Sequence, residues 1–150
     1  MSLPPGEYGG DGIEQLFTNR LDPQAHPYFE RLRDLRVSAH FVIRRDGALL
    51  QFVSCAKRAW HAGASAWQGR AGCNDFSIGI ELEGLEGDTF EAPQYERLAA
   101  VLNALVGRYP IRAVAGHEHV APQRKHDPGA GFDWARLRQL ASLTGVEFAA

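Results

Sequence analysis

The sequence has 150 residues, of which 45% are hydrophobic and 23% are charged, with a formal net charge of −2. This length suits one domain with a sizeable core, and the composition is that of a folded globular chain rather than a disordered or repetitive one. The pI is about 6.3 and the arginines are dispersed, which argues against a nucleic-acid partner. No apolar run approaches the length of a membrane span, and no signal peptide is recognisable.

The two cysteines, Cys55 and Cys73, fit free thiols in a reducing compartment better than a disulfide framework. We therefore expect a cytoplasmic protein that does not associate with membranes, and we expect a monomer.

The first half of the chain predicts short elements separated by turns. Pro and Gly are dense near the start, Pro27 is a favoured first-turn residue, and an Asp-Gly pair between two β-like runs is a hairpin signal. In chain order, we expect a loop over 2–12, a helix from Ile13 to Phe17 capped by Asp11, a helix from Pro27 to Leu35, and strands over 38–44 and 48–53 around Asp46-Gly47.

The middle of the chain combines a long loop with an informative strand. Residues 55–75 lack periodicity and predict a loop with one helical turn, and loops of this length in compact domains are usually functional. A strand is predicted over 76–83, with one face in the core and the other toward solvent or a cleft. Ile78, Ile80 and Leu82 form the core face, and Gly79, Glu81 and Glu83 form the opposite face.

Two helices and a strand are predicted in the second half. Residues 92–109 show helical spacing and stop at Pro110, 111–115 read as a strand, and 132–144 form an amphipathic helix with Gly145 at its C′ position. Strands that alternate with helices, together with one hairpin, predict an α/β fold with a central mixed sheet flanked by helices, in one domain over 1–150.

Residues 116–129 gather three histidines, a lysine and an aspartate into one turn-rich segment. A catalytic zinc ion needs three protein ligands such as imidazole nitrogen and carboxylate oxygen, and a nearby lysine can stabilise an oxyanion. If the segment is extended, Lys125 and Asp127 point the same way and His126 points away. This pattern favours His117 and Asp127 as ligands, with His119 as the lesser candidate; the alternative is a histidine-rich surface loop.

A metal hydrolase also needs a base for the attacking water, and a carboxylate on a neighbouring strand can supply it. Glu81 fits this role best, whereas Glu83 is expected to be solvated. His40 and His61 are expected to be structural. Trp60 is either a core residue or an aromatic platform for a sugar ring.

Several long runs resemble the N-acetylmuramoyl-L-alanine amidase type 2 family, which also includes peptidoglycan recognition proteins. The resemblance spans nearly the whole chain. It is carried by Ser2–Glu7, Asp22–Pro27, Arg36–Phe41, Lys57–Gly63, Cys73–Gly84 and Lys125–Gly129.

The resemblance implies an enzyme that uses zinc, held by two histidines and an aspartate, to cleave the amide between the muramyl lactyl group and L-alanine of anhydromuropeptides in cell-wall recycling. His117 and Asp127 match the second and third ligands, Glu81 the catalytic glutamate and Lys125 the oxyanion-stabilising lysine. The implied substrate-binding residues are Trp60, Arg70 and Asn74.

Two departures from the family pattern affect the expected activity. The family's first zinc ligand is a histidine, followed by asparagine, on a strand just before the run that begins at Ser2, so we expect this sequence to lack that strand and that ligand. Gly72 stands where the family often has arginine, which implies weaker substrate contact. The alternatives are a muropeptide-binding module without catalysis and a zinc hydrolase of a different amide.

Overall fold

The predicted Asp-Gly hairpin lies at the centre of the computed structural model, which describes residues 1–149. Strand β1 (Phe41–Ile43) pairs antiparallel with β2 (Leu49–Gln51), and β5 (Ile80–Leu82) pairs parallel with β1 on its other edge. Asp46 closes the turn because its Oδ1 accepts a hydrogen bond from the Ala48 N–H at 2.9 Å. Gly47 supplies the positive φ, 84°, that the turn requires.

The second half of the chain forms a helical layer and a separate pair of strands. Helix α2 (Ala92–Arg108) and helix α4 (Trp134–Ala141) pack against each other, and Asp133 caps α4 by accepting a hydrogen bond from the Arg136 N–H. Strand β6 (Ala113–Ala115) leads directly into the short helix α3 (His117–Val120). At the C-terminal end, β7 (Glu147–Ala149) pairs parallel with β6.

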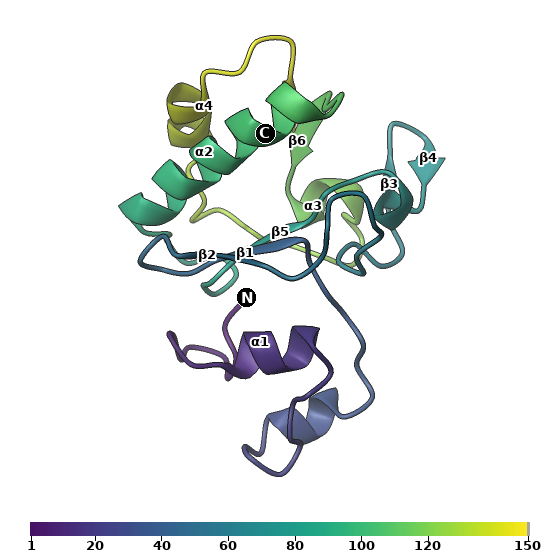
Figure 1. Ribbon diagram of the computed structural model, residues 1–150, viewed down its shortest axis with the longest axis vertical. Coiled ribbons are helices and arrows are strands. Elements are labelled where there is room, and N and C mark those ends of the chain that lie inside the picture. The colour runs from purple at the N-terminus through teal and green to yellow at the C-terminus, as the bar shows by residue number, and fades with distance from the viewer. Residues whose placement is uncertain (150) are drawn as a thin grey trace.

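Helices lie on both sides of the β2-β1-β5 sheet, with α2 and α4 on one side and α1 (Gly12–Phe17) with the N-terminal segment on the other (Figure 1). Consecutive side chains of β1 pack on opposite sides of the sheet: Val42 packs with α1, and Ile43 packs with α2 and α4. This arrangement confirms the α/β class and the mixed sheet flanked by helices. None of the helices in residues 1–149 is both long and apolar enough to cross a membrane.

Several elements differ from the sequence-based expectation. The helix predicted from Pro27 to Leu35 is only the 3₁₀ helix η1, and the strand predicted over 76–83 is shorter. Helix α4 ends at Ala141, and its C-cap Ser142 adopts φ 49°, so the C′ role predicted for Gly145 was wrong. The long loop contains a small hairpin and a 3₁₀ turn. The bounds of these short elements are Phe29–Leu32 for η1, Ala66–Trp67 for β3, Arg70–Ala71 for β4 and Cys73–Asp75 for η2.

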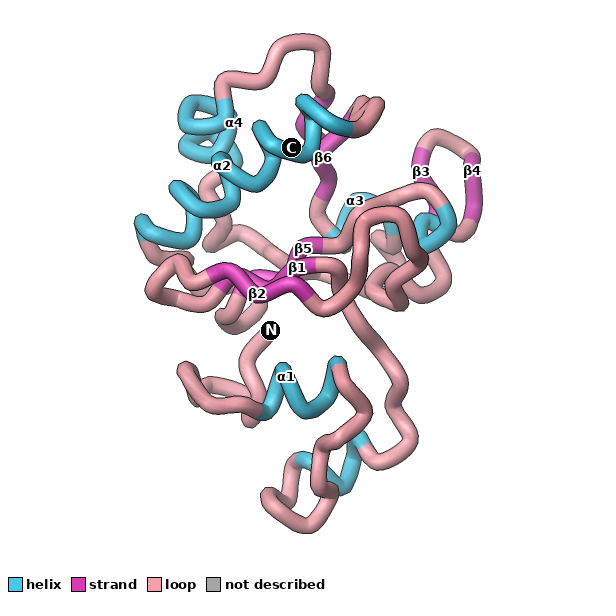
Figure 2. The backbone as a smooth tube through the Cα atoms, in the orientation of Figure 1, coloured by secondary structure: helices cyan, strands magenta, loops and turns pink. Residues whose placement is uncertain are grey.

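The β2-β1-β5 sheet and the β6-β7 pair do not join into one sheet in the described chain. Strand β5 pairs with β1 and β6 pairs with β7, and no hydrogen-bonded ladder connects β5 with β6 (Figure 2). A cavity of about 450 Å³ lies between them, with α2 and α4 contributing leucine side chains to its wall. The cavity extends to the segment that begins at His117, where the polar residues of interest lie.

Candidate active site

His117 and Asp127 face each other at one end of this cavity. His117 is the first residue of α3, immediately after β6, and its Nδ1 lies 3.4 Å from Asp127 Oδ2. The Glu118 N–H donates to the Asp127 carbonyl at 2.9 Å, which holds the two segments together. Burial disfavours the charged carboxylate of Asp127, but the hydrogen bond from His117 and the charges of His117 and Lys125 outweigh it and lower its pKa. The predicted pairing of His117 with Asp127 is therefore present.

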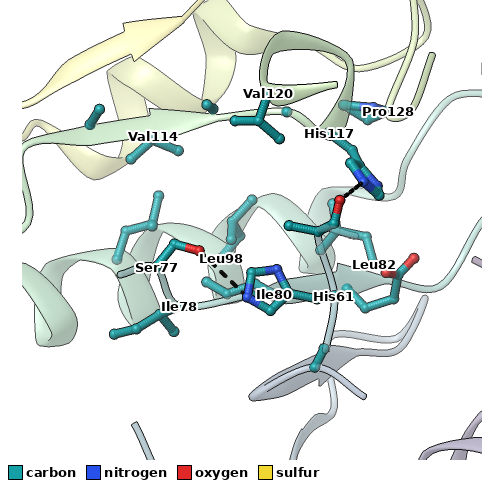
Figure 3. Close-up of a pocket in the computed structure, with 18 of the residues that line it drawn as sticks. His61, Ser77, Ile78, Ile80, Leu82, Leu98, Val114, His117, Val120 and Pro128 are labelled. Atoms are coloured by element: carbon teal, nitrogen blue, oxygen red, sulfur yellow. Dashed lines mark hydrogen bonds between the residues drawn. The ribbon is translucent and has the colours of Figure 1, made fainter. Parts of the chain in front are cut away.

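Glu81 of β5 is among the residues that line the same cavity, whose wall also includes His117 and Asp127. Its carboxylate is partly exposed and accepts a hydrogen bond from the amino group of Met1 at 2.7 Å. Figure 3 shows the segment from Ile78 to Leu82 on one side of the cavity and Val114 with His117 on the other. The wall of one cavity thus contains a carboxylate from β5 together with the His117–Asp127 pair, which comes from α3 and the loop that follows it.

Glu83 is buried, so the expectation of a solvated carboxylate was wrong. Only 3% of its surface is exposed, and its oxygens accept hydrogen bonds from Arg44 Nη1 at 3.0 Å, from the Arg45 N–H at 3.1 Å and from the Gly9 N–H at 2.7 Å. Arg44 also pairs with Glu14; although burial opposes it, hydrogen bonds to these two carboxylates raise the pKa of Arg44. Glu83 is therefore a structural anchor between the strand end and the N-terminal segment.

His40 has the structural role that was predicted. Its Nε2 lies 2.9 Å from the Lys57 carbonyl, and its Nδ1 accepts from the Gly79 N–H at 3.0 Å.

His61, in contrast, lines the cavity, and its ring lies against Gly79 so closely that a Cβ there would be 2.3 Å from His61 Cγ. Burial, aided by the neighbouring His40 and His117, lowers the pKa of His61 to about 4. Sequence reasoning missed this cavity position; its only signal was the placement of Trp60-His61 in an unusually long loop.

The three implied substrate-binding residues have different surroundings. Trp60 is 55% exposed rather than a core residue, and the Arg58 guanidinium stacks 3.9 Å from its ring centre. Arg70 stacks on Phe76, which lines the cavity. Asn74 is buried, and its Oδ1 accepts hydrogen bonds from two consecutive backbone N–H groups, those of His61 and Ala62. The structure thus shows Asn74 shaping the loop, and substrate contact by all three residues stays a prediction.

The remaining histidines of the motif do not join the pair. His119 Nδ1 accepts from the Gly116 N–H at 2.9 Å and its ring packs on Trp134. Within residues 1–149, no group of three or more His, Cys, Asp or Glu side chains is arranged to hold a metal ion. A catalytic zinc site uses three protein ligands, so His117 and Asp127 form an incomplete donor set.

Comparison with known proteins agrees with this geometry. Residues 12–130 match the N-acetylmuramoyl-L-alanine amidase family. The chain is 58% identical to the 1,6-anhydro-N-acetylmuramyl-L-alanine amidase AmpD of Citrobacter freundii, over 95% of this chain and 77% of that protein. A crystal structure of a selenomethionine AmpD derivative superposes with a TM-score of 0.89 at 57% identity, over 93% of this chain and 79% of that one.

A more distant structure contains a ligand. It is the complex of the Escherichia coli amidase AmiD with the substrate anhydro-N-acetylmuramic acid-L-Ala-D-gamma-Glu-L-Lys, which is 34% identical with a TM-score of 0.68, over 81% of this chain and 52% of that chain. The family match and these superpositions identify the chain as an amide hydrolase. The chain belongs to the N-acetylmuramoyl-L-alanine amidase family.

Proposed function

We propose that this chain hydrolyses the amide between the lactyl group of anhydro-N-acetylmuramic acid and L-alanine in muropeptides released during cell-wall recycling. The observation that carries the proposal is the single cavity whose wall contains Glu81 together with the adjacent His117 and Asp127. Relatives at 46–58% identity are named anhydromuramyl-L-alanine amidases, which supports this bond as the substrate.

In this proposal the protein's side chains divide the work of amide hydrolysis. Glu81 lies in the cavity wall and accepts a proton from the attacking water, then returns it to the leaving amine. We propose that the ammonium of Lys125, whose charge contributes to lowering the pKa of the neighbouring Asp127, stabilises the oxyanion of the tetrahedral intermediate. Trp60 and Arg70 are proposed to contact the sugar and peptide.

Zinc is the cofactor we propose from family membership, with His117 and Asp127 as the residues that would hold it. The metal would supply Lewis-acid activation of water and of the carbonyl oxygen. The described residues alone do not fit a complete catalytic site, because two donors are one fewer than such a site uses. A third ligand is therefore part of what must be tested.

The unpaired thiols of Cys55 and Cys73 support a reducing, cytoplasmic location. We also propose a monomer, for which gel filtration with light scattering is the direct test.

The decisive experiment is product analysis. The chain is incubated with an anhydromuropeptide, with and without added zinc, and products are resolved by mass spectrometry. Anhydro-N-acetylmuramic acid plus free peptide supports the proposal, and loss of turnover with a chelator supports zinc dependence. A substrate that stays intact at saturating zinc, or one cut within its peptide, contradicts it.

The incomplete donor set favours one alternative, a muropeptide-binding module without catalysis. Calorimetry with the same anhydromuropeptide, combined with metal analysis of the dialysed protein, separates the two functions. Binding of intact substrate without stoichiometric zinc supports the alternative, whereas turnover contradicts it.

A further inference from the structure

Trp60, in the loop between β2 and β3, has a fixed backbone and an exposed side chain. Its N–H donates to Ser38 Oγ at 3.1 Å, and its carbonyl accepts from the Ser38 N–H at 3.0 Å. The preceding residue, Ala59, is fully buried, yet Trp60 itself is 55% exposed. The backbone therefore fixes the point from which the indole extends, and the side-chain torsions remain as its main freedom.

A guanidinium covers one face of this indole. The Cζ atom of Arg58 lies 3.9 Å from the ring centre of Trp60, within the range of a cation–π contact. The same guanidinium is tied through its Nη1 to Asp75 Oδ1 at 2.9 Å. The Arg58 and Asp75 side chains are 44% and 55% exposed, and an ion pair so open to solvent contributes little to the stability of a fold. We therefore look for its effect in the ring that the guanidinium contacts.

Asp75 belongs to the turn that also fixes the chain immediately after Trp60. It is the last residue of η2, and its neighbour Asn74 is buried. The Oδ1 atom of Asn74 accepts hydrogen bonds from the His61 N–H at 3.0 Å and from the Ala62 N–H at 2.8 Å, and both of these donors belong to residues that line the cavity. Two consecutive residues of η2 thus hold the cavity wall and, through the ion pair, the indole that precedes it in the chain.

We propose that Arg58 and Asp75 are positioning residues for an indole platform that receives the anhydromuramyl sugar. Arg58 occupies one face of the Trp60 ring and leaves the other for the apolar face of the sugar, while Asp75 keeps Arg58 in place. The identity of this ligand rests on the proposed amidase function. A ring that is already held in its binding orientation loses less freedom when substrate arrives, so the effect falls on binding and not on the chemical step.

Nitrogen-15 relaxation of the indole N–H groups in the full chain tests the orientation of the ring without substrate, with the Trp60 signal assigned by comparison with W60F. The Trp60 order parameter should fall from about 0.8 in the wild type to below about 0.6 in R58A, and less far in D75N, which retains the guanidinium. R33A is the matched control, because Arg33 forms a similarly exposed ion pair with Glu30, and it should leave the Trp60 signal unchanged. An order parameter that R58A does not lower would overturn the inference.

Affinity for the anhydromuropeptide tests the consequence for substrate. R58A should raise KM, or Kd measured by calorimetry, roughly three- to tenfold with kcat unchanged. Because Arg58 acts through the ring, this effect should disappear in the W60A background, as a double-mutant cycle measures. An increase of the same size in W60A would mean that Arg58 contacts the ligand itself, and it would overturn the positioning role. If R58A loosens the indole in a chain that neither cleaves nor binds the anhydromuropeptide, the result supports the positioning of the ring and contradicts the proposed function instead.

Discussion

The two sides of the β2-β1-β5 sheet are packed very differently. Toward α1, Val42 and Ile13 are 0% and 1% exposed in a cluster that includes Leu16 and carries no catalytic candidate. Toward α2 and α4, the corresponding core borders the cavity of about 450 Å³ that holds Glu81 and His117. Incomplete packing leaves wall atoms without partners, and this costs stability. The comparison indicates that the α1 side stabilises the fold while the cavity side provides room for chemistry.

Glu81→Ala should produce the largest effect. It should lower activity and leave the stability of the fold unchanged. Loss of a general base lowers kcat by roughly 10² to 10⁴, whereas the partly exposed carboxylate contributes little to packing. Steady-state kinetics on an anhydromuropeptide and thermal unfolding measure the two quantities. The control is Glu96→Gln, at an exposed carboxylate on α2; an unchanged rate in the Glu81 variant would reject its role as the base.

Lys125→Ala should also lower activity without unfolding the protein. Removing an oxyanion-stabilising group costs about 10² to 10³ in kcat. If KM alone rises, Lys125 binds substrate and does not stabilise the transition state.

A matched pair of leucines tests the packing difference directly. Leu16 and Leu102 are 3% and 6% exposed, but only Leu102 lines the cavity. Leu16→Ala should cost about 3–4 kcal/mol and Leu102→Ala about 2–3 kcal/mol in the free energy of unfolding, because the second site already lacks neighbours on one side. Urea denaturation measures both. Equal costs, or a larger cost at Leu102, would mean that the cavity side is as well packed as the α1 side.

The last prediction concerns pH, and its effect is confined to acidic solution. The pKa of His61 falls from its ordinary value of 6.5 to about 4 on folding, so as the pH drops through this window the unfolded state binds the proton first. Stability should therefore decrease between these values, by up to about 3 kcal/mol from this group. His61→Gln should flatten the dependence measured by urea unfolding. His126→Gln is the control. If His61→Gln leaves the slope of stability against pH unchanged, His61 does not cause the loss of stability at low pH.

Local signals made much of the fold predictable. Asp46-Gly47 marked the hairpin, Pro110 marked the end of the α2 pattern, and the lone strand before His117 appeared as β6. The proximity of His117 and Asp127 was also predictable, because both residues lie in one short segment. The sequence also placed Glu81 on the strand face that was expected to meet solvent or a cleft, and Glu81 lines the cavity.

What could not be predicted depends on distant partners. Glu83 is buried because Arg44 and the Gly9 loop supply donors from remote parts of the chain. Strand β7 exists only because Glu147–Ala149 pairs with β6. The cavity position of His61 depends on Gly79, which contacts it from another strand. None of these contacts leaves a periodic pattern in the sequence.

Glu83 lies two residues after Glu81, and side chains two apart on a strand point the same way. The hydrogen bonds that hold Glu83 to Arg44, Arg45 and Gly9 therefore also fix the direction in which Glu81 projects. Through these hydrogen bonds, a shift of the backbone near Gly9 moves Glu83 and, two residues away on the same strand, Glu81. A change in the N-terminal loop, which is far from Glu81 in the sequence, is thus able to alter the orientation of this proposed base.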